Sequence, residues 1–207
     1  HAFTHKGRID LVTEYDKRSE ALLLSLVGER FPGHAILSEE SGIHAGDDGQ
    51  MWYIDPLDGT TNFAHGLPVF CVSIGYADAQ GMLLGVVYDP TRDEMFTAER
   101  GQGAWLNGDK LAVSGTNELL QSLLTTGFAY ENWVIEANLE YFSRFQRLTQ
   151  GLRRLGSAAL DLCYVAYGRV DGYWETSVYP WDLAAGGLRL DGFSLPHLDV
   201  ADVRRNV

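Results

Sequence analysis

The chain has 207 residues, 45% of them hydrophobic, which suits one domain or two small lobes that share a core. Its formal net charge of −12 argues against a nucleic-acid or membrane-surface partner, because both are polyanions and would repel it. No apolar run is long enough to cross a bilayer and no signal peptide is visible. Cys71 and Cys163 lie in apolar stretches, so we expect reduced thiols in a cytoplasmic protein. The chain begins with His1, so we expect its natural start to precede this residue.

The first half of the chain predicts one helix followed by short strands. Thr13 with Asp16 three residues later is typical of a helix N-cap, and Phe31-Pro32-Gly33 ends the helical pattern. We expect the strand over 51–54 to end on Asp55, where Pro56 turns the chain. Asn107-Gly108 is a tight-turn signal. The predicted strands are 35–37, 51–54, 69–76, 82–88 and 94–98, the third and fourth being antiparallel partners around the turn at 78–81.

The second half predicts helices that alternate with a strand. Residues 131–148 have helical spacing, with one apolar face formed by Leu139, Phe142, Phe145 and Leu148. Further elements are a helix of small residues over 157–167, a strand over 170–174 and a helix that starts near Asp182 and runs over 184–190. Such blocks indicate stacked layers of helix and sheet.

The segment WYIDPLDGTTNF, residues 52–63, predicts a site for cations and phosphate. Hydrophobic residues deliver Asp55 to a strand end, and Asp58 follows three residues later. Gly59 lets the backbone approach a ligand, and Thr60 and Thr61 can open a helix whose free N–H groups suit a phosphate. Two carboxylates are suitable ligands for a hard cation. An isolated D-P-x-D string would be interpreted as a solvated turn, but further acidic clusters favour a site.

Three other segments add acidic residues in apolar settings. Glu39 and Glu40 follow a predicted strand and repel each other unless they are exposed or share a cation. Asp182 follows Trp181 at a predicted helix start, where N-capping alone would explain it. The segment DLVTEYD adds Asp10, Thr13 and Asp16, which capping could also explain. The six histidines lack metal-ligand spacing, and we find no convincing arginine clamp.

Six ordered segments together resemble the inositol monophosphatase family, the lithium-sensitive, metal-dependent phosphatases. They are DLVTEYD (10–16), SEES (38–41), WYIDPLDGTTNFAHG (52–66), GSAALDLCYVA (156–166), DGYWE (171–175) and PWDLAAG (180–186). The resemblance implies an α/β fold, the layered αβαβα sandwich that the family shares with fructose-1,6-bisphosphatase. We treat it as a single domain over 1–207 with lobes 1–125 and 126–207.

The resemblance also implies a site for two or three Mg²⁺ ions. Carried over by position, Glu39, Asp55 and the Leu57 carbonyl hold the first ion. Asp55, Asp58 and Asp182 hold the second, and Glu39 assists a third through water. Asp58, Gly59 and Thr60 line the phosphate, the last two through backbone N–H groups, and Thr60 with Asp16 orients the attacking water. The remaining substrate contacts, to hydroxyl groups, are Glu175, Asp182 and the backbone of Gly156, Ser157 and Ala158.

The expected reaction is hydrolysis of myo-inositol monophosphate or a similar polyol phosphate by metal-activated water, without a covalent enzyme intermediate. Family members carry a helix before the first segment and strands after the last. We therefore expect a sandwich truncated at both ends, in which either segments are absent from the chain as given or the protein is a trimmed relative. The family is commonly dimeric, so a homodimer is expected.

Three alternatives stay open on the sequence alone. The first is a sister phosphatase acting on fructose-1,6-bisphosphate, 3′-phosphoadenosine 5′-phosphate or histidinol phosphate, although Thr60-Thr61 and Glu175 favour inositol phosphates. The second is a haloacid-dehalogenase-like phosphatase with a nucleophilic aspartate, which the three-residue spacing of Asp55 and Asp58 disfavours. The third is a non-catalytic domain that binds divalent cations.

Overall fold

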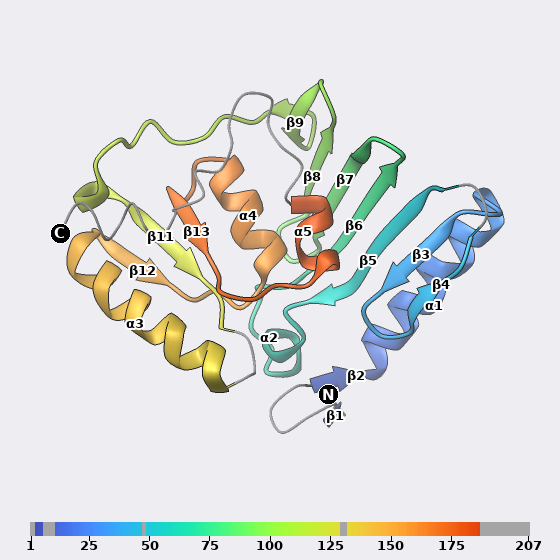
Figure 1. Ribbon diagram of the computed structural model, residues 1–207, viewed down its shortest axis with the longest axis horizontal. Coiled ribbons are helices and arrows are strands. Elements are labelled where there is room, and N and C mark those ends of the chain that lie inside the picture. Colours follow the sequence, from blue (N-terminus) through green and yellow to red (C-terminus); the bar gives the residue numbers. More distant parts are fainter. Residues whose placement is uncertain (1–2, 6–10, 47–48, 129–131, 187–207) are drawn as a thin grey trace.

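Five layers of helix and sheet make up the molecule (Figure 1). The structure is a computed structural model that describes residues 3–5, 11–46, 49–128 and 132–186. The layers are helix α1, an eight-stranded sheet, helices α4 and α5, a three-stranded sheet and helix α3. The helices span Glu14–Arg30 (α1), Asn132–Leu148 (α3), Ala158–Ala166 (α4) and Pro180–Gly186 (α5). This order is the αβαβα sandwich that the sequence predicts.

The large sheet has the order β10-β9-β8-β7-β6-β5-β3-β4. Only β3 and β5 are parallel neighbours, and every other pair is antiparallel. Its strands are β3 (Ala35–Ser38), β4 (Gly42–His44), β5 (Met51–Asp58), β6 (Cys71–Asp78), β7 (Gly81–Asp89), β8 (Glu94–Glu99), β9 (Gly103–Leu106) and β10 (Asp109–Lys110). A separate two-stranded sheet pairs β1 (Phe3–His5) with β2 (Leu11–Thr13).

The small sheet is parallel, with the order β12-β11-β13. Its strands are β11 (Leu123–Thr126), β12 (Gly151–Arg153) and β13 (Gly172–Trp174), preceded by a 3₁₀ turn over Leu119–Gln121. Helix α3 connects β11 to β12, and α4 connects β12 to β13. Helix α3 contacts β12, whereas α4 contacts β11 and β13 and also reaches β6 and β7 of the large sheet. Helix α4 therefore lies between the two sheets.

Separate clusters of buried side chains hold the layers together. Val27 of α1 packs on Ile36 and Ile54 of the large sheet. Phe145 of α3 packs on the small sheet with Leu124. The largest cluster joins the large sheet to the central helices and includes Cys71, Val87, Phe96, Leu160 and Cys163. Each interface removes apolar surface from water, which is the main favourable term in folding.

Local signals in the sequence account for the ends of several elements. Thr13 caps α1 and forms a capping box with Asp16, as predicted. At the turn between β9 and β10, Asn107 has φ of 50° and Gly108 has φ of 93°, the backbone that a tight Asn-Gly hairpin requires. Both cysteines are buried free thiols, in agreement with the sequence analysis. Among the described helices, none has the length and apolar character needed to cross a bilayer.

Three sequence-based expectations differ from the structure. Strand β5 does not end on Asp55 but continues to Asp58, because an irregularity in its pairing with β6 accommodates Pro56. Leu139 is 51% exposed and does not belong to the buried face of α3. The neighbouring polar residue Asn138 is fully buried instead. The strand predicted over 170–174 begins at Gly172. The residues after Gly186 lie outside the described part of the chain, and the division into lobes 1–125 and 126–207 stays a prediction.

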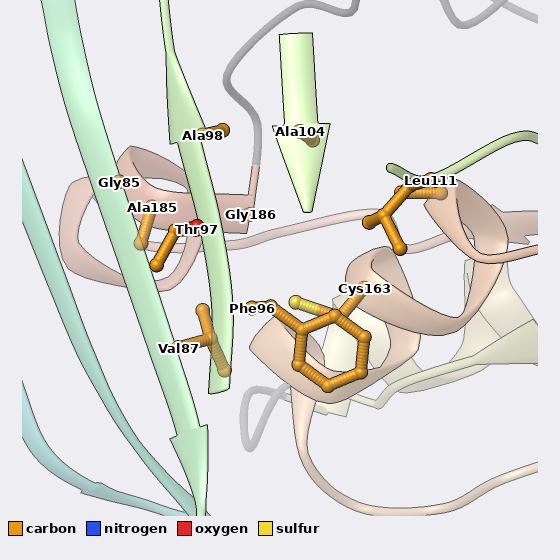
Figure 2. A pocket seen from close by; sticks show the side chains of 11 residues that line it. Gly85, Val87, Phe96, Thr97, Ala98, Ala104, Leu111, Cys163, Ala185 and Gly186 are labelled. Carbon is orange, nitrogen blue, oxygen red and sulfur yellow. The ribbon is translucent and has the colours of Figure 1, made fainter. Parts of the chain in front are cut away.

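An apolar hollow lies between strands β7–β9 and helices α4 and α5 (Figure 2). Small and apolar side chains line it, among them Val87, Phe96, Ala104, Cys163 and Ala185. None of its lining residues carries a formal charge at neutral pH. The hollow therefore offers no charged side chain that could bind an anion or a divalent cation.

Candidate active site

A second, polar hollow opens where the two sheets meet the central helices. It brings together every predicted site residue except Asp16. Asp16 is fully buried behind the hollow and accepts a hydrogen bond from Thr60 Oγ1 at 2.9 Å. The predicted residues that line the hollow are Glu39, Asp55, Leu57, Asp58, Gly59, Thr60, Gly156, Ser157, Ala158, Glu175 and Asp182. Segments that are far apart in the sequence thus form one pocket.

The pairing of β3 with β5 places Glu39 beside Asp55. The strands are parallel and Ser38 lies opposite Ile54, so the residues that follow emerge at the same edge of the sheet. The Glu39 backbone N–H donates to Ile54 O at 3.1 Å. On the other side, β6 places Ser73 opposite Asp55. Parallel strands present their carboxyl ends together, which explains why these acidic residues meet.

The Asp58 carboxylate bridges the large sheet and the central helix α4. Its Oδ2 accepts hydrogen bonds from Ser157 Oγ at 2.7 Å and from the Ala159 backbone N–H at 2.8 Å. Ser157 is the N-cap of α4, so the positive end of the helix dipole faces this carboxylate. The thiol of Cys71 lies 3.7 Å from the same oxygen. The family resemblance implied only a backbone contact for Ser157 and gave no indication of this side-chain bond.

Thr60 lies at the first turn of the short helix α2 (Thr60–Ala64). Its hydroxyl is within hydrogen-bond distance of both Asp16 Oδ1, at 2.9 Å, and Leu57 O, at 3.0 Å. Gly59 before it has φ of 92°, and a Cβ there would lie 2.8 Å from Val69 O. Glycine is required at this position for both reasons. His65, the C-cap of α2, does not line the hollow.

Asp182 reaches the hollow because helix α5 lies very close to the large sheet. A Cβ on Gly75 of β6 would lie only 2.6 Å from Ala184 Cβ, and a Cβ on Gly186 would lie 2.9 Å from Leu162. Small residues thus allow α5 to fit between β6 and α4. At the start of α5, the Asp182 carboxylate accepts a hydrogen bond from the backbone N–H of Tyr179, the residue before the helix, at 2.8 Å. Asp182 is therefore not the N-cap that the sequence suggested: α5 begins two residues earlier, at Pro180, and Asp182 lies in its first turn.

Burial and mutual repulsion raise the pKa values of the carboxylates in the hollow. Burial is the largest cause for Asp55, whose pKa lies well above its ordinary value, and the charges of Glu39, Asp58 and Asp182 add to it. Burial also raises the pKa of Asp58, although the Ser157 and Ala159 hydrogen bonds oppose the shift. It raises the pKa of Asp182 to about 7. Such a cluster favours bound protons or a bound cation.

The donor set of this cluster suits a hard divalent cation, since carboxylate and carbonyl oxygens are the ligands that Mg²⁺ prefers. Within the described residues, however, no three His, Cys, Asp or Glu side chains are placed as ligands of one ion. Asp58 turns one oxygen toward Ser157, and Asp182 turns one toward the Tyr179 N–H. Repulsion between carboxylates favours such contacts with local donors, so a cation would have to draw the side chains together.

Glu175 lies on the side of the hollow that the small sheet forms. Its Oε2 accepts a hydrogen bond from Tyr173 OH at 2.5 Å. A Cβ on Gly127 would lie 1.9 Å from the same oxygen, so a larger residue there would displace this carboxylate from its position. Burial raises the pKa of Glu175, and the Tyr173 hydrogen bond and the charge of Arg154 oppose the shift.

Two charged residues of the hollow were missed in the sequence analysis. Arg154 lines the hollow, although no arginine clamp was found in the sequence. Asp161 of α4 also lines it and is 1% exposed, and burial raises its pKa to about 8. The nearby Thr125 hydroxyl opposes this shift. A single carboxylate in the apolar segment 157–167 was the available signal for Asp161.

Comparison with known proteins identifies the family. The sequence profile of the inositol monophosphatase family matches residues 2–191. The chain belongs to the inositol monophosphatase family. It is 53% identical over 184 residues to an inositol-1-monophosphatase of Synechocystis, covering 87% of this chain and 64% of that protein. It is 48% identical over 189 residues to the Nus factor SuhB of Pasteurella multocida, covering 89% of this chain and 70% of that protein.

Solved structures of family members share the fold. The inositol monophosphatase from Anabaena is 52% identical with a TM-score of 0.81, and the match covers 86% of this chain and 71% of the other. An IMPase/NADP phosphatase complexed with Mg²⁺ and phosphate is 27% identical with a TM-score of 0.77, covering 90% and 70%. The predicted αβαβα sandwich and the predicted family are therefore confirmed. The chain spans about two thirds of the length of these two inositol monophosphatases, from Synechocystis and Anabaena.

Proposed function

We propose that the protein is a Mg²⁺-dependent phosphatase that hydrolyses myo-inositol monophosphate or a similar small polyol phosphate. The observation that carries the proposal is the meeting of Glu39, Asp55, Asp58 and Asp182 in one hollow beside Gly59 and Thr60. Family membership supports the reaction class, and the relative solved with Mg²⁺ and phosphate supports the choice of cation.

The carboxylates and the Leu57 carbonyl would hold two or three Mg²⁺ ions. When bound, Mg²⁺ neutralises the charge of the phosphate and activates water for attack on phosphorus. The backbone N–H groups of Gly59 and Thr60 bind phosphate oxygens. Asp16 holds the Thr60 hydroxyl at 2.9 Å and so orients it toward the attacking water.

The opposite side of the hollow binds the part of the substrate that leaves. Glu175 accepts hydrogen bonds from sugar-like hydroxyls, which suits a polyol better than an apolar group. The backbone of 156–158 at the start of α4, together with Asp182, makes the remaining contacts. Asp161 and Arg154 lie on the same side of the hollow and extend the polar surface available to such a substrate.

A substrate panel tests the proposal. Phosphate release from inositol 1-phosphate should require Mg²⁺ and stop with a chelator. The alternatives in the panel are fructose-1,6-bisphosphate, 3′-phosphoadenosine 5′-phosphate and histidinol phosphate. Faster release from one of these would assign a sister activity, and no release from any would favour a domain that only binds cations.

The stereochemistry at phosphorus tests direct attack by water. One in-line displacement inverts the configuration of a chiral phosphorothioate substrate, whereas two displacements through a phosphoryl-enzyme retain it. Inversion is expected, and retention or a trapped phosphoryl-enzyme would contradict the proposal.

The expected homodimer and the cytoplasmic location stay predictions. Sedimentation equilibrium of the full-length protein should give twice the mass of one chain. The same mass as one chain would contradict the dimer.

A further inference from the structure

We propose that Glu20 is a positioning residue that holds the turn carrying Glu39 and so sets the affinity of the site for divalent cations. The proposal rests on the function proposed above. Glu20 lies in α1, is 7% exposed and does not line the hollow.

The carboxylate of Glu20 binds the residues on both sides of Glu39. Its Oε1 accepts hydrogen bonds from the Ser38 hydroxyl, from the Glu40 backbone N–H at 3.2 Å and from the Ser41 backbone N–H at 3.1 Å. The Ser41 hydroxyl donates to the same oxygen at 3.1 Å. Four donors of one short segment thus converge on a single oxygen atom.

This segment is the tight turn between β3 and β4. Ser38 pairs with Gly42, so only residues 39–41 form the turn. The Glu39 N–H is bound separately to Ile54 O at 3.1 Å. With Glu20 in place, the backbone of Glu39 is held from two sides, and its side chain keeps its direction toward Asp55. Buried carboxylates that accept several hydrogen bonds rigidify their surroundings.

Two neighbours of Glu20 on α1 hold other segments of the site. Asp16, Ser19 and Glu20 lie at positions i, i+3 and i+4, and therefore on one face of the helix. Asp16 accepts from Thr60, and the Ser19 hydroxyl donates to Pro56 O at 2.9 Å. One face of α1 thus supports the backbone around Thr60, Pro56 and Glu39. The geometry makes α1 a common support for the segments that carry the carboxylates.

The test compares Glu20→Ala with Glu29→Ala in the full-length protein. Glu29 lies on the same helix, is exposed and is hydrogen-bonded to Ser25, so it is a matched control. Isothermal titration with MgCl₂ measures cation binding, and initial rates at increasing Mg²⁺ measure activation. Glu20→Ala should weaken Mg²⁺ binding by about tenfold or more, as loss of an outer partner of a metal ligand does. Glu29→Ala should bind like the wild type.

A double-mutant cycle separates positioning from general destabilisation. If Glu20 acts through Glu39, its loss should add little once Glu39→Gln is present. Glu20→Gln keeps an oxygen acceptor and should restore most of the affinity. Ser41→Ala removes one donor at an exposed position, so it tests the contact even if Glu20→Ala does not fold. It should weaken Mg²⁺ binding by about twofold to threefold.

The outcomes distinguish this inference from the proposed function. If the wild type neither binds Mg²⁺ nor releases phosphate, the proposed function fails. If the wild type does both, but folded Ser41→Ala binds Mg²⁺ like the wild type while Glu20→Ala either matches Glu29→Ala or does not fold, the inference is overturned. Independent, multiplying effects of Glu20→Ala and Glu39→Gln would overturn it as well.

Discussion

At the scale of single residues, the hollow contains more acidic groups than its surroundings can neutralise. Asp55 is buried and raised in pKa by burial and by the charges of Glu39, Asp58 and Asp182. Arg154 is the one Lys or Arg among the residues described as lining the hollow, and it is exposed. An uncompensated buried carboxylate destabilises the folded state, so the arrangement has a cost that a bound cation would offset.

The substitution Asp55→Asn should separate activity from folding. It removes a shared ligand and a negative charge but keeps the side-chain shape. Loss of an outer partner of a metal ligand lowers metal affinity or activity by up to about a hundredfold. Asp55 is proposed as a ligand itself, so we expect phosphate release to fall by more than this. The unfolding temperature without Mg²⁺ should not fall, because repulsion inside the cluster is relieved. Near-normal turnover would refute the assignment of Asp55, and thermal scans provide the folding control.

Asp161 should make the stability of the protein depend on pH. Its pKa is raised from 3.8 to about 8 in the folded state. Between these values the folded chain binds more protons than the unfolded chain, so the contribution of this group to stability is present at low pH and is lost as pH rises. In Asp161→Asn the unfolding free energy should decrease less steeply as pH rises, by up to about 1.4 kcal/mol per pH unit. Urea unfolding from about pH 5 to pH 8 measures the slope, with exposed Asp109→Asn as control.

At the scale of elements, helices set the positions of the site residues. Helix α1 contacts the segments that carry Thr60, Pro56 and Glu39, and the N-terminus of α4 binds Asp58. Helix α5 brings Asp182 to the hollow through its close approach to β6. A change in how a helix lies on the sheet should therefore change the site without touching a ligand.

The substitution Gly75→Ala should move α5. The new Cβ would lie 2.6 Å from Ala184 Cβ and 2.9 Å from the Ala184 carbonyl carbon, so the helix must shift. We expect a loss of about 1–3 kcal/mol in unfolding free energy from overpacking, together with weaker catalysis as Asp182 is displaced. Gly28→Ala in α1 is the matched control, because its Cβ would meet nothing within 4 Å. It should stabilise the protein by about 0.5–1 kcal/mol. Equal stability of the two variants in urea unfolding would contradict this view of α5.

At the scale of the whole molecule, the two sheets and the central helices meet at one polar hollow. The large sheet supplies Asp55 and Asp58, whereas the small sheet is followed by Glu175. Substrate and cations would therefore contact both halves of the sandwich at once. Ligands that bind only the folded state stabilise it, so the joining of the halves should depend on Mg²⁺.

Addition of Mg²⁺ should raise the unfolding temperature of the wild type. At about a hundred times the dissociation constant, the gain in unfolding free energy is about 2.7 kcal/mol. The net charge of −12 means that any salt will screen repulsion, so KCl of equal ionic strength is the control. A chelator should reverse the effect. An equal shift with KCl alone, or a full shift in Asp55→Asn, would argue against a specific cation site.

Local patterns in the sequence determined much of the fold. The capping box of Thr13 and Asp16, the turn at Asn107-Gly108 and the turn at 78–81 between β6 and β7 each depend on neighbouring residues alone. The predicted residues that line the hollow all came from the resemblance of short, ordered segments to the family. Short-range physics and a family resemblance were sufficient for these.

Only the tertiary structure decided which groups face each other across the site. The contacts of Ser157 with Asp58 and of Glu20 with Ser41 join residues 99 and 21 positions apart. The burial of Asp161 and the place of Arg154 at the hollow depend on how α4 fits between the sheets. The repulsion that raises the carboxylate pKa values exists only once the chain has folded. Such contacts arise from the packing of distant layers, which no local pattern in a single sequence specifies.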